Sequence, residues 1–416
     1  MVDPFVMKQY LFAGLLSALT GCESSYARSP AAQGSVIPGI SVLVNDSAHL
    51  IRGKRVGLIT NHTGRDAAGR SSIDLLFKTP GVKLTALFAP EHGIRGLAEG
   101  GAKIASGVDE QTGVPIYSLY GDTKTPTSKE LANVDVLVYD IQDVGARMYT
   151  YVWTMTLAAE AASKAGKTFI VVDRPDPIRS DVAEGGMIEP QYRSFTGLHN
   201  VPLRYGLTPA ELAMYLAGTK QIAADVKVVP MKGYRESMWW DETGLTWINP
   251  SPNIRGVDAA LLYPGISFFE ATNVSEGRGT DSPFKLVGAS WLDDASAIAR
   301  AMNATKLGGV TFDAVTRAVG RGEKFGGMTI PMVRITITDR NAVRSSEIGA
   351  HLLREIYSRH PKQFKWQRGQ GIEELSGSRD LRTAVQTGGI PKLLGRWRAA
   401  SSAFLRETAP YRLYTR

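Results

Sequence analysis

The chain has 416 residues, of which 43% are hydrophobic and 21% are charged, and this composition excludes a disordered or fibrous protein. The length predicts two or three globular domains with a large buried core. The net charge of +8 comes from scattered Lys and Arg residues without a basic helix, so we expect no nucleic-acid partner. A mildly basic surface suits anionic wall polymers or lipid headgroups, although an ordinary solvated surface explains it as well.

The first residues have the pattern of a bacterial signal peptide. Lys8 precedes an apolar run from Tyr10 to Leu19, which is the length of a signal-peptide core and too short to span a bilayer. The run ends in Leu19-Thr20-Gly21-Cys22, which resembles a lipobox, and Met7 resembles the natural start of the chain. We therefore predict a signal peptide over residues 1–22 and a tether over residues 23–35.

Cys22 is the only cysteine of the chain, so it cannot form an internal disulfide, and acylation accounts for its presence. Glu23 in the next position resembles the outer-membrane sorting pattern of lipoproteins. These features predict a protein that a lipid on Cys22 anchors in the bacterial cell envelope, at the periplasmic face of the outer membrane. The alternative is a secreted protein cleaved near Ala27 or Ala32.

Apolar strands alternate with helical stretches after the tether, which is typical of an α/β fold. Strands are predicted at Lys54–Thr60, Val82–Phe88, Asp135–Tyr139 and Thr168–Val172, and helices at Ser71–Phe77 and Tyr149–Ala165. Each strand leads into a polar loop punctuated by Gly or Pro, and such loops meet at one rim of a parallel sheet. No strand is followed by G-x-G-x-x-G or a P-loop, so we expect a Rossmann-like domain, residues 36–283, without a cofactor.

A helix start is predicted at Thr208, because Pro209 occupies the first helical position and Glu211 completes a capping box. A strand follows at Val226–Pro230. Three tryptophans then gather near a polar loop: Trp239, Trp240 and Trp247. Two interpretations of them stay open, a sugar-stacking platform or a part of the core.

The segment Glu270–Phe284 lacks both helical and strand periodicity and follows an apolar run, so we expect a loop. Gly277 and Gly279 flank Arg278 and permit positive φ on both sides of the cation. Polar loops on a rigid base often carry function, although a solvated surface loop is the alternative.

The remaining residues, 284–416, predict a second, smaller α/β domain that forms one wall of a cleft between the two domains. Helices are expected at Asp293–Asn303 and Ser346–Arg359, and a strand at Pro331–Thr338.

Three groups of polar residues are candidates for chemistry: Glu91 with His92; Asp140, Gln142, Asp143 and Arg147; and Asn273, Glu276 and Arg278. There is no G-x-S-x-G nucleophile and no H-E-x-x-H pair. His62, His92, Asp140 and His199 lack ligand-pair spacing, so we expect no metal.

Paired carboxylates without a metal suit the cleavage of a glycosidic bond. Glu91 is the candidate acid, because partial burial after a strand raises a carboxyl pKa. Its alternative role is an ion pair with Arg95 or Arg147. Glu184 and Glu276 compete for the role of second carboxylate. Arg147 and Arg278 are candidates to bind an anionic substrate group, or else internal ion-pair partners.

An ordered set of segments resembles the NamZ-type exo-β-N-acetylmuramidases, long catalogued as a domain of unknown function. The resemblance covers Val36–Arg416 and is carried by GLITNHTGRD (57–66), LFAPEHGIRG (87–96), VYDIQDVGARMYTY (138–151), VVDRPDP (171–177), NPSPNIRG (249–256) and LYPGISFFEATNVSEGRGTDSPF (262–284). It implies the removal of terminal N-acetylmuramic acid from the non-reducing end of peptidoglycan fragments.

The resemblance places the family's PEHG glutamate on Glu91. The family pattern V-E-G-P reads Ala183-Glu184-Gly185-Gly186 here, which puts the role of Glu184 in doubt. The resemblance also implies a substrate with a lactyl carboxylate, which Arg147 or Arg278 is expected to bind. The expected substrate-binding residues are Asn61, His62, His92, Asp140, Gln142, Arg147, Asn273 and Arg278.

Retaining, inverting and substrate-assisted mechanisms all stay open at this point. The alternatives to a muramidase are a peptidoglycan-binding lipoprotein without activity and an esterase or amidase on the same polymer.

Overall fold

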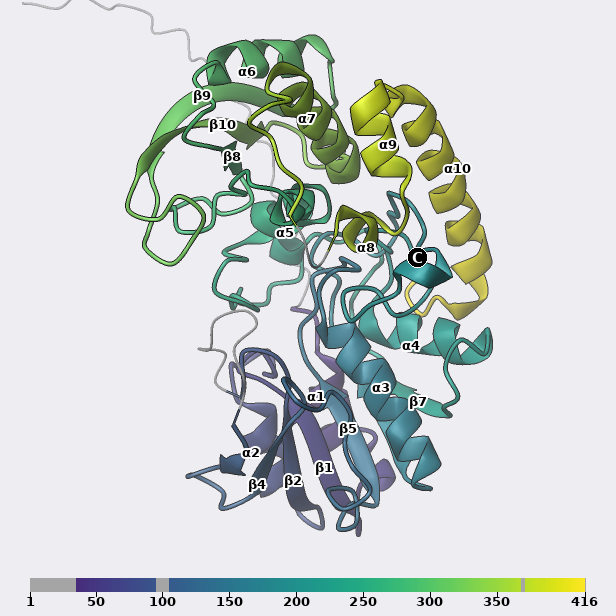
Figure 1. Cartoon of the computed structure of the whole chain (residues 1–416). Coiled ribbons are helices and arrows are strands. Elements are labelled where there is room, and N and C mark those ends of the chain that lie inside the picture. The colour runs from purple at the N-terminus through teal and green to yellow at the C-terminus, as the bar shows by residue number, and fades with distance from the viewer. Residues whose placement is uncertain (1–34, 95–104, 368–370, 416) are drawn as a thin grey trace, which may run out of the picture. The chain divides into compact units, whose positions relative to one another are not determined.

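A seven-stranded sheet dominates the first half of the computed structural model, which describes residues 35–94, 105–367 and 371–415 (Figure 1). Its strands are β1 (Arg55–Thr60), β2 (Lys83–Ala89), β3 (Gly107–Val108), β4 (Pro115–Ser118), β5 (Val136–Asp140), β6 (Thr168–Val172) and β7 (Val226–Val229). They lie in the order β3-β4-β2-β1-β5-β6-β7, and every neighbouring pair is parallel except β3 with β4. The predicted parallel sheet is confirmed.

Helices cover both faces of this sheet because its strands are apolar on both sides. Leu58 of β1 packs into a core with helices α1 (Gly39–Asn45) and α2 (Ser72–Lys78). The next residue, Ile59, faces a larger core that includes α3 (Tyr151–Lys164) and α4 (Pro209–Gly218). Successive strand residues point to opposite faces, so one short apolar run serves two cores.

Helix α4 starts where the capping box predicts. The Thr208 hydroxyl accepts a hydrogen bond from the Glu211 amide at 3.3 Å, and the Glu211 carboxyl accepts one from the Thr208 amide at 2.9 Å. Pro209 is the first helical residue, where its missing N–H costs no hydrogen bond.

A second, three-stranded sheet follows, and it is antiparallel in the order β8-β10-β9. Its strands are β8 (Leu286–Gly288), β9 (Val310–Ala318) and β10 (Thr329–Ile337). The helices of this half are α5 (Val257–Ile266), α6 (Ala295–Ala304), α7 (Ser345–Arg359), α8 (Ile372–Ser376), α9 (Asp380–Thr387) and α10 (Ile390–Thr408). Single 3₁₀ turns lie at Ala48–Leu50, Pro190–Tyr192, Trp240–Glu242, Ser267–Ala271 and Ala409–Tyr411. The predicted α6, α7 and β10 are present, whereas β8, β9, α5 and α8 to α10 are additional elements.

The segment after α10 returns to the first sheet. The Leu413 amide donates to Glu211 at 2.8 Å, and the Tyr414 hydroxyl donates to Asp173 at 2.6 Å. The ring of Tyr414 packs edge-on against Tyr234, with the ring centroids 5.0 Å apart. Burial raises the pKa of Asp173 to about 6, and the hydrogen bond from the Tyr414 hydroxyl partly opposes the rise. Residues far apart in the chain therefore share one core.

Residues 35–416 form one compact unit, and the division into domains at residue 283 stays a prediction. Cys22 and the other residues of the predicted signal peptide lie outside the described residues. Within the part of the chain that the structure describes, every helix is too short or too polar to cross a bilayer.

Candidate active site

The crevice at the carboxyl ends of β1 and β5 is filled by the protein's own side chains. Strand order reverses here, which is where open parallel sheets usually bind ligands. Asp140 is fully buried, and its carboxylate accepts hydrogen bonds from the Arg174 guanidinium, one of them at 2.9 Å, and from the Ser72 hydroxyl. This buried ion pair closes the crevice, so Asp140 is unavailable to a substrate.

Three further predicted substrate-binding residues lie in the same filled crevice. The Asn61 side chain accepts two hydrogen bonds from Thr63, and the Gln142 side chain donates to two backbone carbonyls at 2.7 and 2.8 Å. His62 donates through Nε2 to the Asn249 carbonyl at 2.8 Å, and burial lowers its pKa. Asp143 is also buried, which raises its pKa to about 7, and the Tyr205 hydroxyl donates to it. These contacts support the fold, and none of these residues lines the cleft described next.

A cleft of about 730 Å³ opens beside this filled crevice, toward the β2 and β4 side of the sheet. It is lined by Glu91, His92, Tyr120, Met148, Tyr149, Thr150, Phe195, Thr196, Ser251, Pro252, Asn253, Ile254, Tyr263, Glu270, Glu276, Arg278, Phe284, Arg321, Gly322, Glu323 and Lys324. The lining joins strand ends of the large sheet to loops of the C-terminal half. Its size and its mixture of aromatic and charged groups suit a small, polar ligand.

Glu91 enters this cleft just beyond the end of β2, where it is half-buried. The Thr150 hydroxyl, at the start of α3, donates to its Oε2 at 2.6 Å. Tyr120, which follows β4, lies beside Glu91, and burial together with this carboxylate raises the pKa of the phenol. The carboxyl group of Glu91 is therefore held in one orientation between a hydroxyl and a phenol.

The turn that carries Glu91 has an unusual backbone. His92 is buried and has φ of 66°, a left-handed conformation that non-glycine residues rarely adopt. Gly93 follows with φ of 74°, which glycine tolerates. Such conformations persist where the surroundings enforce them and are concentrated at functional sites. His92 lines the cleft, as expected, next to the candidate acid.

The opposite wall holds a cluster of two carboxylates and two cations, in which Glu276 is buried and the other three residues are half-buried. Glu276, 3% exposed, lies 3.1 Å from Arg278 Nε and 2.9 Å from Lys324 Nζ. Arg278 also donates to Glu270 at 2.7 Å. Burial opposes the charge of Arg278, but Glu270 and Glu276 more than offset it and raise its pKa. Each carboxylate oxygen of Glu276 contacts a cation. This geometry favours a structural role, in which Glu276 positions Arg278 and Lys324 in the cleft wall.

Aromatic rings form the floor between the two walls. Tyr149 packs edge-on against Tyr263 at 5.9 Å, and Tyr263 packs edge-on against Phe284 at 4.9 Å. Tyr120 and Phe195 form a second pair at 6.1 Å. Ring faces and edges of this kind bind the apolar faces of sugars.

The tryptophans of the predicted stacking platform lie elsewhere. Trp239 and Trp240 are 4% and 6% exposed, and Trp247 packs edge-on against Trp240 at 5.4 Å. None of them lines the cleft. Of the two interpretations that the sequence leaves open, the structure supports the core.

Arg147 is the clearest departure from the expected substrate-binding set. It is fully buried, and its guanidinium donates to the carbonyls of Gly186, Val201 and Leu375 at 2.8 to 3.0 Å. Burial lowers its pKa to about 9. Because these carbonyls belong to separate segments, Arg147 ties the backbone together and is not placed to bind an anion.

Glu184 also lies away from the cleft. It pairs with the buried Arg204 at 3.5 Å and accepts hydrogen bonds from the amide and hydroxyl of Ser346 at 3.1 and 3.0 Å. Ser346 is in the first turn of α7, where the helix dipole favours a carboxylate. Glu184 is thus placed as a helix cap rather than as a partner of Glu91.

Asn273 is likewise committed to the backbone. Its side chain donates to the Gln363 carbonyl at 2.9 Å and accepts from the Lys365 amide at 2.8 Å. It holds the loop before β8 against the segment that follows α7. Among the residues predicted from sequence, Glu91, His92, Glu276 and Arg278 share the cleft, and their roles in it stay predictions.

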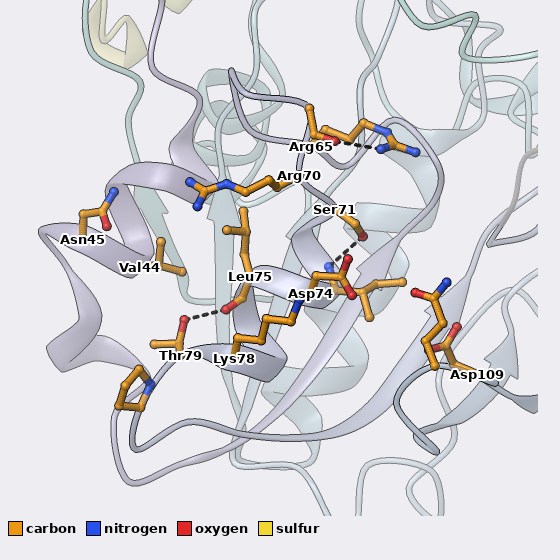
Figure 2. Close-up of a pocket in the computed structure, with 14 residues that line it drawn as sticks. Val44, Asn45, Arg65, Arg70, Ser71, Asp74, Leu75, Lys78, Thr79 and Asp109 are labelled. Carbon is orange, nitrogen blue, oxygen red and sulfur yellow. Dashed lines mark hydrogen bonds between the residues drawn. The ribbon is translucent and has the colours of Figure 1, made fainter.

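Two other features of the described structure resemble binding sites. A hollow of about 550 Å³ lies beside α2 (Figure 2), and three of its polar groups serve the local backbone: Arg65 donates to the Gly69 carbonyl, Thr79 to the Leu75 carbonyl, and Ser71 caps α2. Asp293, Asp294 and His360 bring ligand atoms within 4.8 Å of one another. Arg359 already pairs with Asp294 at 3.2 Å, and His360 Nε2 lies 2.7 Å from the same carboxylate.

The residues that sequence reasoning missed are the aromatic floor and the β9–β10 turn. The turn carries Gly320-Arg321-Gly322, which repeats the Gly277-Arg278-Gly279 pattern singled out from sequence. That repetition is visible in the sequence and is the signal that identifies the turn. The floor residues carry no comparable signal, because buried tyrosines of the core have the same local pattern.

Comparison with known proteins identifies the family. The N-terminal and C-terminal family models of exo-beta-N-acetylmuramidase NamZ match residues 56–258 and 261–414. The chain belongs to the NamZ family. It is 39% identical, over 399 residues, to a protein of Bacillus subtilis (strain 168) named peptidoglycan beta-N-acetylmuramidase NamZ, with 96% of this chain and 95% of the relative covered.

Two solved structures extend the NamZ comparison to the fold. Both are DUF1343 family proteins from Bacteroides fragilis NCTC 9343. One is 35% identical with a TM-score of 0.85, covering 93% of this chain and 100% of the other. The second is 27% identical with a TM-score of 0.71, covering 91% and 99%. The resemblance inferred from sequence motifs is confirmed.

Proposed function

We propose that this protein is an exo-acting glycoside hydrolase that releases terminal N-acetylmuramic acid from the non-reducing end of peptidoglycan fragments. The observation that carries the proposal is a cleft in which Glu91 faces aromatic rings and cations, in a chain of the NamZ family. The Bacillus subtilis relative is named for action on this polymer and this sugar linkage. Turnover of the cell wall is the process that such a reaction serves.

Glu91 is the residue that we assign to protonation of the leaving oxygen. A general acid must be held in place and partly shielded from water, and the hydrogen bond from Thr150 at 2.6 Å with half-burial meets both needs. Tyr149 of the aromatic floor and Ser251 also line the cleft, and we expect them to bind the sugar; burial keeps the Tyr149 phenol protonated by raising its pKa. Glu276 holds the facing wall through its two cations.

The test is hydrolysis of a chromogenic β-glycoside of N-acetylmuramic acid by the purified full chain. Wild type should release the aglycone, and Glu91→Gln should lower kcat by about 10²- to 10⁴-fold, which is the usual contribution of a general acid. Glu110→Gln is the matched control, because Glu110 is exposed and outside the cleft. Wild-type protein that binds muropeptides without hydrolysis would instead support the non-catalytic binding protein. A wild-type kcat for Glu91→Gln would remove the acid assignment.

We further propose that a lipid on Cys22 anchors the protein at the periplasmic face of the outer membrane. The support is the Leu19–Cys22 motif, the single cysteine and Glu23. Cells expressing the protein should incorporate labelled palmitate into the wild-type chain and none into Cys22→Ser. The variant should appear in the soluble fraction after a high-salt wash, and a variant that stays in the membrane fraction would contradict the anchor.

A further inference from the structure

Two Gly-Arg-Gly turns meet at the cleft in direct backbone contact. The first is 277–279, in the loop before β8, and the second is 320–322, between β9 and β10. The Gly320 amide donates to the Gly279 carbonyl at 2.8 Å. Gly279 has φ of 77°, and a Cβ on it would lie 3.1 Å from the Gly320 nitrogen. Glycine at this position therefore permits both the turn and the close approach.

Lys324, which follows the second turn, holds that turn against the segment 269–276. Its ammonium donates to the carbonyls of Phe269 and Val274 at 2.8 and 3.1 Å, and to Glu276 at 2.9 Å. Three acceptors satisfy the three N–H groups of this ammonium. The turn between β9 and β10 thus has a defined position over the cleft, and Lys324 has no remaining donor for a ligand.

The two arginines of these turns have opposite surroundings. Arg278 is paired with Glu270 and Glu276, and its guanidinium lies 5.1 Å from the centre of the Phe284 ring. Arg321 lines the same cleft and is exposed. With the residues that the structure describes, Arg321 makes neither a hydrogen bond nor an ion pair. Carboxylates already balance the charges of Arg278 and Lys324, whereas none is paired with Arg321.

We propose that Arg321 binds the lactyl carboxylate of the terminal sugar and so selects N-acetylmuramic acid over N-acetylglucosamine, which lacks that group. The inference rests on the proposed function and assigns anion recognition to a residue other than Arg147 and Arg278. Arg147 already donates to backbone carbonyls, and Arg278 already pairs with two carboxylates. A guanidinium on a fixed turn matches a carboxylate with two parallel hydrogen bonds.

The size of the effect follows from the kind of contact. Charge-assisted hydrogen bonds are about twice as strong as neutral ones, and a site that is open to solvent weakens them. Loss of the Arg321 contact should therefore reduce kcat/KM for the muramic acid substrate by about 10- to 100-fold. The kcat/KM for a substrate without the carboxylate should stay unchanged, because that substrate never contacts Arg321.

The experiment compares full-chain wild type and Arg321→Gln on matched chromogenic β-glycosides of N-acetylmuramic acid and N-acetylglucosamine. We expect the ratio of the two kcat/KM values to fall by about 10- to 100-fold, and Arg321→Lys to retain part of it because it keeps the charge. Competitive inhibition by the two free sugars measures the same preference without turnover. Arg317→Gln is the matched control, since Arg317 is on the same hairpin but outside the cleft.

Each outcome has a defined meaning. An unchanged ratio in Arg321→Gln, with wild-type thermal unfolding, would place carboxylate recognition elsewhere and overturn the inference. An equal loss on both substrates would also overturn it, because it would assign Arg321 to the shape of the cleft. A wild-type protein that hydrolyses neither glycoside would refute the proposed function, which is a result distinct from either of these.

Discussion

Replacing Glu276 with Gln tests whether this carboxylate holds the cleft wall or reacts with substrate. Glu276 is 3% exposed and stands between Arg278 at 3.1 Å and Lys324 at 2.9 Å. A glutamine keeps one oxygen for one of these cations and turns its amide N–H groups toward the other. Removal of one partner of a buried ion pair costs about 3–5 kcal/mol. Arg278 keeps Glu270 at 2.7 Å, so we expect the lower end, about 3 kcal/mol.

Guanidinium unfolding followed by tryptophan fluorescence measures this loss as a fall in the free energy of unfolding. Asp281→Asn is the matched control in the same loop, because Asp281 is 74% exposed and 3.9 Å from Arg317, and its unfolding should match that of wild type. Unfolding of Glu276→Gln with the wild-type free energy would contradict a structural role for Glu276. If its kcat also falls by 100-fold or more, Glu276 belongs among the reacting groups.

Three further predictions concern other parts of the structure. Burial raises the pKa of Asp143 to about 7, so its protonated form stabilises the fold below about pH 4, and this contribution is lost as the pH rises toward 7. The free energy of unfolding of Asp143→Asn, measured against pH, should therefore rise relative to that of wild type across this window. Parallel curves for the two proteins would contradict the raised pKa. Gly279→Ala places a Cβ 3.1 Å from the Gly320 nitrogen at φ of 77°, which should lower the free energy of unfolding by about 1–2 kcal/mol and raise KM, whereas Gly395→Ala, in open space on α10, should leave KM unchanged. Glu184→Gln should lower stability by about 3 kcal/mol with kcat per folded molecule unchanged, and a kcat reduced 100-fold would return Glu184 to the catalytic group.

Much of the sheet can be predicted because its strands are short apolar runs that end in polar turns. β6 has the predicted bounds, and α4 begins at its predicted cap. Helix α10 was not predicted, although its buried residues Ile390, Leu393, Leu394, Trp397 and Phe404 follow the spacing of one helical face. The signal for this helix is therefore present in the sequence.

The site could be predicted in part, because the rule that ligands bind at strand ends does not say which strand ends remain open. Arg174, delivered by β6, fills the crevice that Asp140 also faces, and this contact depends on the packing of distant segments. A buried arginine such as Arg147 has the same sequence appearance as a ligand-binding one. Burial decides between the two roles, and burial is a property of the whole fold.

The return of residues 412–414 to the first sheet has a consequence for synthesis of the chain. Strand β7 is complete at Val229, yet Asp173 and Glu211 receive hydrogen bonds from Tyr414 and Leu413. A nascent chain therefore carries two buried acids without these donors until the residues after α10 have been translated. A chain that ends within α10 therefore leaves the core of the first sheet incomplete, and we expect it to be less stable than the full chain.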